Sequence, residues 1–124
     1  MQSVKVVFHI DEVEKWPLLL ANARNLIKVV DVKASSIVVL VNSKAAIIFE
    51  EQNAGVSSLD KEQANQGDLV KELAENGVEF KLCQNSLNGL GIAIDSLPVY
   101  VDVVPVGVLE LIEKQADGFA YIKP

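Results

Sequence analysis

The chain alternates between short apolar runs and longer amphipathic stretches, and this alternation predicts strands separated by helices. Residues 37–41, Ile-Val-Val-Leu-Val, are apolar without a break, which is typical of a strand covered on both faces inside a parallel sheet. In contrast, Val78, Phe80 and Leu82 alternate with charged residues, the period of a strand with one better-buried face. Together with other runs rich in β-branched residues, the pattern predicts strands at residues 4–10, 37–41, 78–82, 99–104 and 119–122.

Helical spacing of apolar residues predicts the elements between these strands. A proline suits the first turn of a helix, so the first helix is expected over residues 17–31. Ser43 is a candidate N-cap for a short helix over residues 45–52. Later helices are expected from about Asn85 and over residues 108–115.

The polar stretch 53–67 is rich in Gln, Asn and Ser and predicts a loop that leads into a helix. Asp60 or Asp68 is the expected cap of that helix, and Gly77 is the expected stop. The order of elements is therefore β–α repeated four times and then a final strand. It predicts an α/β fold, a single-domain three-layer sandwich over residues 1–124 with a mostly parallel five-stranded sheet.

Composition and charge narrow the class of protein. A chain of 124 residues that is 50% hydrophobic and 23% charged is expected to bury one core. So much apolar side chain in a small domain also favours burial between subunits, and hence a homo-oligomer. The net charge of −6 and the lack of a basic run argue against direct nucleic-acid binding. No apolar run is long enough for a membrane span or a signal peptide, so we expect a cytoplasmic protein without a membrane partner.

The candidate chemistry gathers where the predicted strands end. In a parallel sheet the carboxyl ends of all strands meet at one edge, where ligands bind. The only cysteine, Cys83, follows the third predicted strand and precedes residues that can start a helix. Helix N–H groups favour a thiolate, so Cys83 is the candidate catalytic residue and is expected to lie uncovered and easily ionised. Residues at the same edge are candidates for binding a substrate: His9, Asp11, Asn42, Asn85, Ser86 and Gly107.

Each of these residues also has a simpler structural interpretation. Cys83 can be a small buried hydrophobic residue, and His9 can be a hydrogen-bonded residue that closes a strand. Asn42 and Ser86 can be helix caps. Trp16, next to a proline, is either a packing contact at the helix entry or an interface residue, and the sequence leaves that choice open.

Several familiar sites are missing from the sequence. No GxGxxG, GxxxxGK[ST] or GxSxG motif occurs, which argues against dinucleotide, nucleoside-triphosphate and serine-hydrolase sites. With one cysteine and one histidine, the chain has no internal disulfide or CxxC motif, and a zinc site would depend mostly on carboxylates. We therefore expect no metal and no cofactor.

Five segments give the chain a resemblance to the DsrE/DsrF-like family, particularly to its small branch with a Gly-aromatic-Ala-Tyr-Ile-Lys-Pro tail. The resemblance implies a compact α/β sandwich that assembles into trimers or hexamers. In the sulfur-relay members of that family, a cysteine after the third strand carries sulfur as a persulfide, and Cys83 matches that position. The segments are Lys5–His9, Asn25–Leu26, Gly77–Leu87, Val106–Leu111 and Gln115–Pro124.

The sequence thus supports a hypothesis of a sulfur-relay protein that exchanges a persulfide on Cys83 with donor and acceptor proteins. Asn85 and Ser86 are expected to donate hydrogen bonds to the terminal sulfur, and His9 to shift the local charge. A second hypothesis is a non-catalytic oligomeric protein with a small-ligand pocket at the carboxyl edge of the sheet. A third is a structural or regulatory subunit of an assembly.

Overall fold

The computed structural model describes residues 1–54 and 61–124, and its sheet is parallel throughout. The spatial order of the strands is β4-β3-β2-β1-β5, with every neighbouring pair parallel. The predicted parallel five-stranded sheet is therefore confirmed. The strands are β1 (Lys5–Ile10), β2 (Ser36–Val41), β3 (Val78–Cys83), β4 (Val101–Val104) and β5 (Ala120–Ile122).

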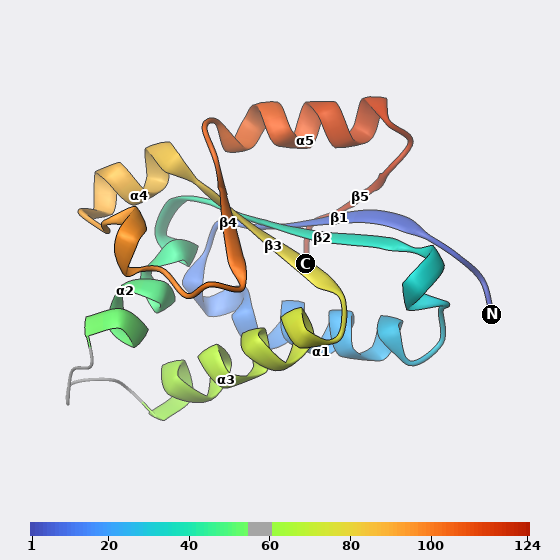
Figure 1. The fold of residues 1–124 in the computed structure, drawn as a ribbon, viewed down its shortest axis with the longest axis horizontal. Helices are drawn as coiled ribbons and strands as arrows, with labels where there is room; N and C mark the ends of the chain where they lie inside the picture. The colour runs from blue at the N-terminus through green and yellow to red at the C-terminus, as the bar shows by residue number, and fades with distance from the viewer. Residues whose placement is uncertain (55–60) are drawn as a thin grey trace.

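Helices cover both faces of this sheet, which makes the predicted three layers. Figure 1 shows α1 and α3 beneath the sheet and α5 alone above it, while α2 and α4 lie near the carboxyl ends of the strands. None of the helices in the described part of the chain is long and apolar enough to span a membrane. The helices are α1 (Trp16–Ile27), α2 (Ile47–Ala54), α3 (Lys61–Glu75), α4 (Gln84–Leu90) and α5 (Gly107–Ala116).

The alternation of side chains along each strand decides which face a residue occupies. On β2, the central strand, Ile37, Val39 and Val41 pack in the large core toward α1 and α3, whereas Val38 and Leu40 pack in the smaller core toward α5. The unbroken apolar run predicted this burial on both faces correctly. The same parity places alternate residues of β1 and β3 on the α5 side, and this side carries the candidate site.

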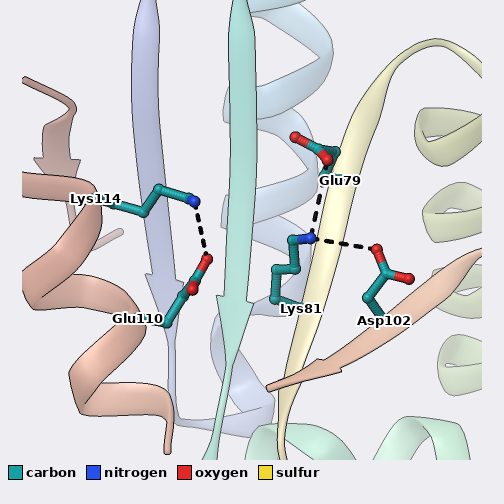
Figure 2. Close-up of polar contacts among 5 residues, drawn as sticks. All are labelled: Glu79, Lys81, Asp102, Glu110 and Lys114. Atoms are coloured by element: carbon teal, nitrogen blue, oxygen red, sulfur yellow. Dashed lines mark hydrogen bonds and ion pairs between the residues drawn. The ribbon is translucent and has the colours of Figure 1, made fainter. Parts of the chain in front are cut away.

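One helix covers only part of that upper face. Figure 2 shows Lys81 of β3 between two carboxylates, with Nζ 3.3 Å from Asp102 and 3.9 Å from Glu79. It also shows Glu110 and Lys114 of α5, which form an ion pair of 3.2 Å. Pairs open to solvent stabilise little. The exposed carboxylates of Glu79 and Asp102 mark the region over β3 and β4 as the polar, more open part of the face.

Several predicted boundaries are corrected by the structure. The first helix ends at Ile27 and not near residue 31. The fourth strand begins at Val101, because Val99 is fully exposed and the Val101 N–H closes a turn onto the Pro98 carbonyl. The last strand begins at Ala120, one residue later than predicted.

The helix expected to begin within the polar stretch 53–67 or just after it starts at the earlier of its two predicted positions. Helix α2 continues to Ala54, and α3 already begins at Lys61. Asp68 therefore lies inside α3 and does not cap it, while Asp60 lies outside the described residues. Ser43 does not cap α2, because a 3-10 turn precedes that helix and Ser43 adopts a left-handed conformation with φ of 54°.

Trp16 is a packing residue and not an interface residue of this chain. Its side chain is fully buried, and Nε1 donates to the Ala45 carbonyl at 2.9 Å. The Phe49 ring meets the indole edge-on, with ring centroids 6.1 Å apart. The indole therefore joins α1 to the segment that follows β2.

Replacing Trp16 with Phe removes this hydrogen bond and leaves a smaller ring in the core. We expect Trp16→Phe to lower the free energy of unfolding by about 1–3 kcal/mol. Leu18→Ala, on the half-exposed side of the same helix, is the matched control and should change it by less than about 0.5 kcal/mol. Urea denaturation measures both, and equal losses would contradict the packing role.

Candidate functional site

Cys83 lies where two helices begin. It is the last residue of β3 and the N-cap of α4, with extended backbone angles. Gly107, the first residue of α5, donates its backbone N–H to Cys83 Sγ at 3.3 Å. The prediction that Cys83 joins a strand to a helix is confirmed, and the structure adds a second helix start that faces the same sulfur.

The close approach of α5 depends on the missing side chain of Gly107. A Cβ at this position would lie 3.1 Å from Cys83 Cβ, 3.2 Å from Leu40 Cδ1 and 3.4 Å from Sγ. Such distances are tighter than ordinary van der Waals contact. Gly107 thus contributes to the site through its backbone, and a larger residue would crowd Cys83 and Leu40 by a few tenths of an ångström.

The structure corrects the expectation that Cys83 is uncovered. Its exposed fraction is 6%. The start of α5 lies against the sulfur, and Leu40 of the neighbouring strand fills the space beside it. This cover depends on how α5 returns across the sheet, which the local sequence around Cys83 does not reveal.

Burial and hydrogen bonding act on the thiol in opposite directions. Burial raises the pKa of Cys83, but donors around the sulfur outweigh it and bring the pKa below the ordinary thiol value. These donors are the backbone N–H and hydroxyl of Ser86, followed by the N–H groups of Gly107 and Asn85. Cys83 makes no side-chain capping bond within α4, so the N–H groups of that helix act as nearby dipoles.

Ser86 connects the sulfur to the end of β2. Its Oγ accepts a hydrogen bond of 2.7 Å from the Ser43 N–H, and its hydroxyl favours the Cys83 thiolate. The positive φ of Ser43 is uncommon for a residue with a side chain. The turn after β2 is therefore held directly against the first turn of α4.

A second polar group lies two strands away at the same edge. His9 Nδ1 lies 2.7 Å from Tyr121 Oη, and His9 Nε2 lies 3.0 Å from Asn42 Oδ1. The rings of His9 and Tyr121 are tilted at 51° with centroids 5.8 Å apart. Residues from β1, β5 and the end of β2 thus form one continuous hydrogen-bonded chain.

The other predicted site residues are less closely engaged with the sulfur. Asp11 forms an ion pair of 3.2 Å with Lys123, and this contact with the carboxylate raises the pKa of Lys123. Asn85 has an exposed side chain and acts on Cys83 through its backbone only. Ser86, Asn85 and Gly107 therefore act directly on Cys83, whereas Asp11 contacts the C-terminal segment.

The sequence indicates no chemistry for Tyr121. Its place became visible only once β5 was known to lie beside β1, in a register that pairs Tyr121 with Val7. Tyr121 then shares the α5 side with His9, two residues farther along β1. The sequence predicted the strand that holds Tyr121, but not its neighbouring strand.

Two grooves formed by described residues lie away from the sulfur. A groove of about 500 Å³ lies under the other end of β1, between Val4, Val6 and Leu26, and a second one borders Gly77. Within the described ranges, no group of three or more His, Cys, Asp or Glu side chains is arranged to hold a metal ion. The arrangement at Cys83 is suited to a nucleophilic thiolate surrounded by backbone donors.

Comparisons with known proteins agree with this architecture. The model of the DsrE/DsrF-like family matches residues 2–124. The structure of MTH1491, a protein of unknown function from Methanobacterium thermoautotrophicum, is 33% identical, with a TM-score of 0.77 over 98% of this chain and 100% of that one. The ychN protein from E. coli shares the fold at 14% identity, with a TM-score of 0.60 and full coverage of both chains. The comparison with curated proteins found no match.

The donors at Ser86 predict a shift that a single variant can detect. Ser86→Ala removes the hydroxyl but keeps the backbone N–H, so the pKa of Cys83 should rise toward the ordinary thiol value. Asn85→Ala keeps its backbone N–H and should leave that pKa unchanged. The ultraviolet absorbance of the thiolate against pH, corrected with Cys83→Ser, measures both variants.

The same shift has a defined effect on stability. Because the folded thiol loses its proton at a lower pH than the unfolded one, the folded state gains stability as pH rises from the folded pKa toward about 8.5. Cys83→Ser should lack this gain, and Ser86→Ala should show a smaller one. A wild-type gain no larger than that of Cys83→Ser would contradict the lowered pKa.

Proposed function

Because this chain belongs to the DsrE/DsrF-like family, which is generally linked to sulfur relay, we propose that it is an intracellular sulfur carrier that holds a persulfide on Cys83. The observation that supports this role best is the pair of helix starts directed at one sulfur, with the Gly107 N–H donating at 3.3 Å. A thiolate stabilised in this way is nucleophilic near neutral pH.

The transfer step needs no external oxidant or reductant. The Cys83 thiolate attacks the outer sulfur of a donor persulfide, a new S–S bond forms, and the donor's inner sulfur leaves as a thiolate. The outer sulfur and any proton on it move together to Cys83. Delivery repeats the same exchange, with an acceptor thiolate as nucleophile and Cys83 as leaving group.

A lone cysteine suits a carrier of this kind. A second thiol in the same chain could attack the persulfide and discharge it as a disulfide, but Cys83 is the only cysteine. Loading and delivery are therefore intermolecular, with donor and acceptor proteins as partners. The low exposure of Cys83 protects the persulfide from other thiols and requires a partner to approach at the sheet edge.

The outer side of α5 is the proposed interface of a homo-oligomer, a trimer or hexamer. Val108, Leu109 and Ile112 are each 50–58% exposed on this helix. Apolar side chains grouped on one helix are typical of a subunit interface. Since α5 begins at Gly107, assembly through this helix would also fix the cover over Cys83.

A ligand-binding role for the carboxyl edge has less support. The groove of about 500 Å³ lies at the opposite end of β1 from Cys83. A ligand-binding protein would show thermal stabilisation by its ligand that survives Cys83→Ser, whereas a carrier would not depend on such a ligand.

The direct test is sulfur loading of the intact protein. With a cysteine desulfurase and cysteine, wild-type protein should gain the mass of one sulfur atom, and a reductant should remove it. Cys83→Ser should gain none, and Ser86→Ala should load more slowly at neutral pH because less of its thiol is ionised. Intact-mass spectrometry reads all three, and an unmodified wild-type protein would contradict the proposal.

The proposed interface makes a separate prediction. Wild-type protein should have a solution mass that is a multiple of its 13.5 kDa chain, and Leu109→Glu should shift it toward the monomer by placing a charge in the apolar contact. Glu113→Gln, an exposed position on the same helix, is the control and should not change the mass. Light scattering after gel filtration measures it, and a monomeric wild type would exclude the assembly.

A further inference from the structure

We propose that Asn42 donates a hydrogen bond from its amide Nδ2 to the outer sulfur of the Cys83 persulfide, and that His9 and Tyr121 hold the amide in the required orientation. This inference rests on the function proposed above and adds a residue that recognises the transferred sulfur. The evidence for it is the register of β2 against β3 and the hydrogen bonds of His9. This evidence is independent of the donors that lower the pKa of the Cys83 thiol.

The register places Asn42 beside Cys83. In the pairing of β2 with β3, Val41 lies opposite Leu82. The residue after Val41 is Asn42, and the residue after Leu82 is Cys83. Val41 and Leu82 both pack in the large core, so the residues that follow them project to the α5 side. Adjacent strands lie about 4.8 Å apart, which makes these two side chains lateral neighbours.

The hydrogen bonds of His9 decide which end of the amide faces the sulfur. Asn42 Oδ1 can only accept, so His9 Nε2 carries the hydrogen in the 3.0 Å contact. In the neutral ring Nδ1 is then an acceptor, and the Tyr121 hydroxyl donates to it at 2.7 Å. The Tyr121 hydroxyl, which can donate or accept, thus completes the hydrogen bonding of the ring tautomer that binds the amide oxygen.

The other end of the amide is left for a ligand. With Oδ1 turned to His9 on β1, the Nδ2 group is directed away from β1, toward the side on which β3 and Cys83 lie. Among the residues that the structure describes, none accepts a hydrogen bond from Nδ2. An amide N–H group near a thiolate site is a suitable donor to a sulfur anion.

The reach of a persulfide matches this arrangement. No hydrogen bond joins Asn42 to Sγ, and Asn42 is not among the groups that shift the thiol. An S–S bond adds about 2.05 Å beyond Sγ, which spans much of the distance between neighbouring strands. Asn42 should therefore act on the persulfide but not on the thiol.

Because Asn42 should act on the persulfide and not on the thiol, the test measures both the persulfide half-life and the thiol pKa. Wild-type and variant proteins are loaded with inorganic polysulfide and desalted. The half-life of the persulfide is then followed by intact mass, and the pKa of the unloaded thiol is measured separately. Asn42→Ala should shorten the half-life about tenfold, as for one lost charge-assisted hydrogen bond, and leave the thiol pKa unchanged. Asn25→Ala, exposed on α1, is the control and should change neither.

Asn42→Asp distinguishes recognition of sulfur from a structural role. Aspartate has the same shape and keeps an oxygen for His9, so a residue needed only for structure would be rescued. A residue that donates to the sulfur would not be rescued, because the carboxylate offers no donor and repels the anion. The half-life should then be shorter than in Asn42→Ala.

Variants of His9 test the positioning role. His9→Ala releases the amide and should shorten the persulfide half-life several-fold, whereas His9→Gln keeps an N–H group that can donate to Oδ1 and should recover most of it. Neither variant should change the pKa of the unloaded Cys83 thiol through Asn42, because Asn42 forms no hydrogen bond with that sulfur.

The outcomes separate this inference from the proposed function. If wild-type protein retains no sulfur, the carrier function fails and the role of Asn42 fails with it. If wild-type protein is loaded but Asn42→Ala matches its half-life, or Asn42→Asp restores it, the carrier function stands and the role of Asn42 is overturned.

Discussion

The candidate site depends on the contact between the Gly107 backbone and the Cys83 sulfur. The N–H···Sγ distance of 3.3 Å brings the first turn of α5 onto the end of β3, where α4 also begins. The missing side chain of residue 107 favours this contact, since a Cβ would meet Cys83 and Leu40 at 3.1 and 3.2 Å, which is tighter than usual packing. Gly107 thus contributes both to the cover over the sulfur and, after Ser86, to the donors that lower its pKa.

Covering a thiol and ionising it are opposing requirements, and the structure meets both with backbone groups. An apolar cover alone would keep the sulfur protonated, because burial disfavours the charged form. Here the buried sulfur is met by the N–H groups of two helix starts and by the Ser86 hydroxyl, which replace the lost water. A protected persulfide needs this combination, because solvent exposure would favour its loss to other thiols.

Side-chain parity explains how much of this could be predicted. Alternation and apolar runs identified the strands, and the break in alternation after Leu82 placed Cys83 at a strand end. The start of α3 stayed open between two aspartates, because its inner face uses Gln66 and Gly67, both buried, where no apolar residue marks a helix. The low exposure of Cys83 and the role of Tyr121 depend on the paths of α5 and β5 across the sheet, which no local pattern encodes.

The central claim is that donors from two helices lower the pKa of the buried Cys83 thiol below that of the unfolded chain. The most direct measurement is the apparent pKa of this single thiol in the wild-type protein, from thiolate absorbance against pH, compared with the same titration of the unfolded chain in urea. The account predicts a folded value clearly below the unfolded one of about 8.5. A folded value at or above the unfolded one would show that burial dominates, and it would contradict the account.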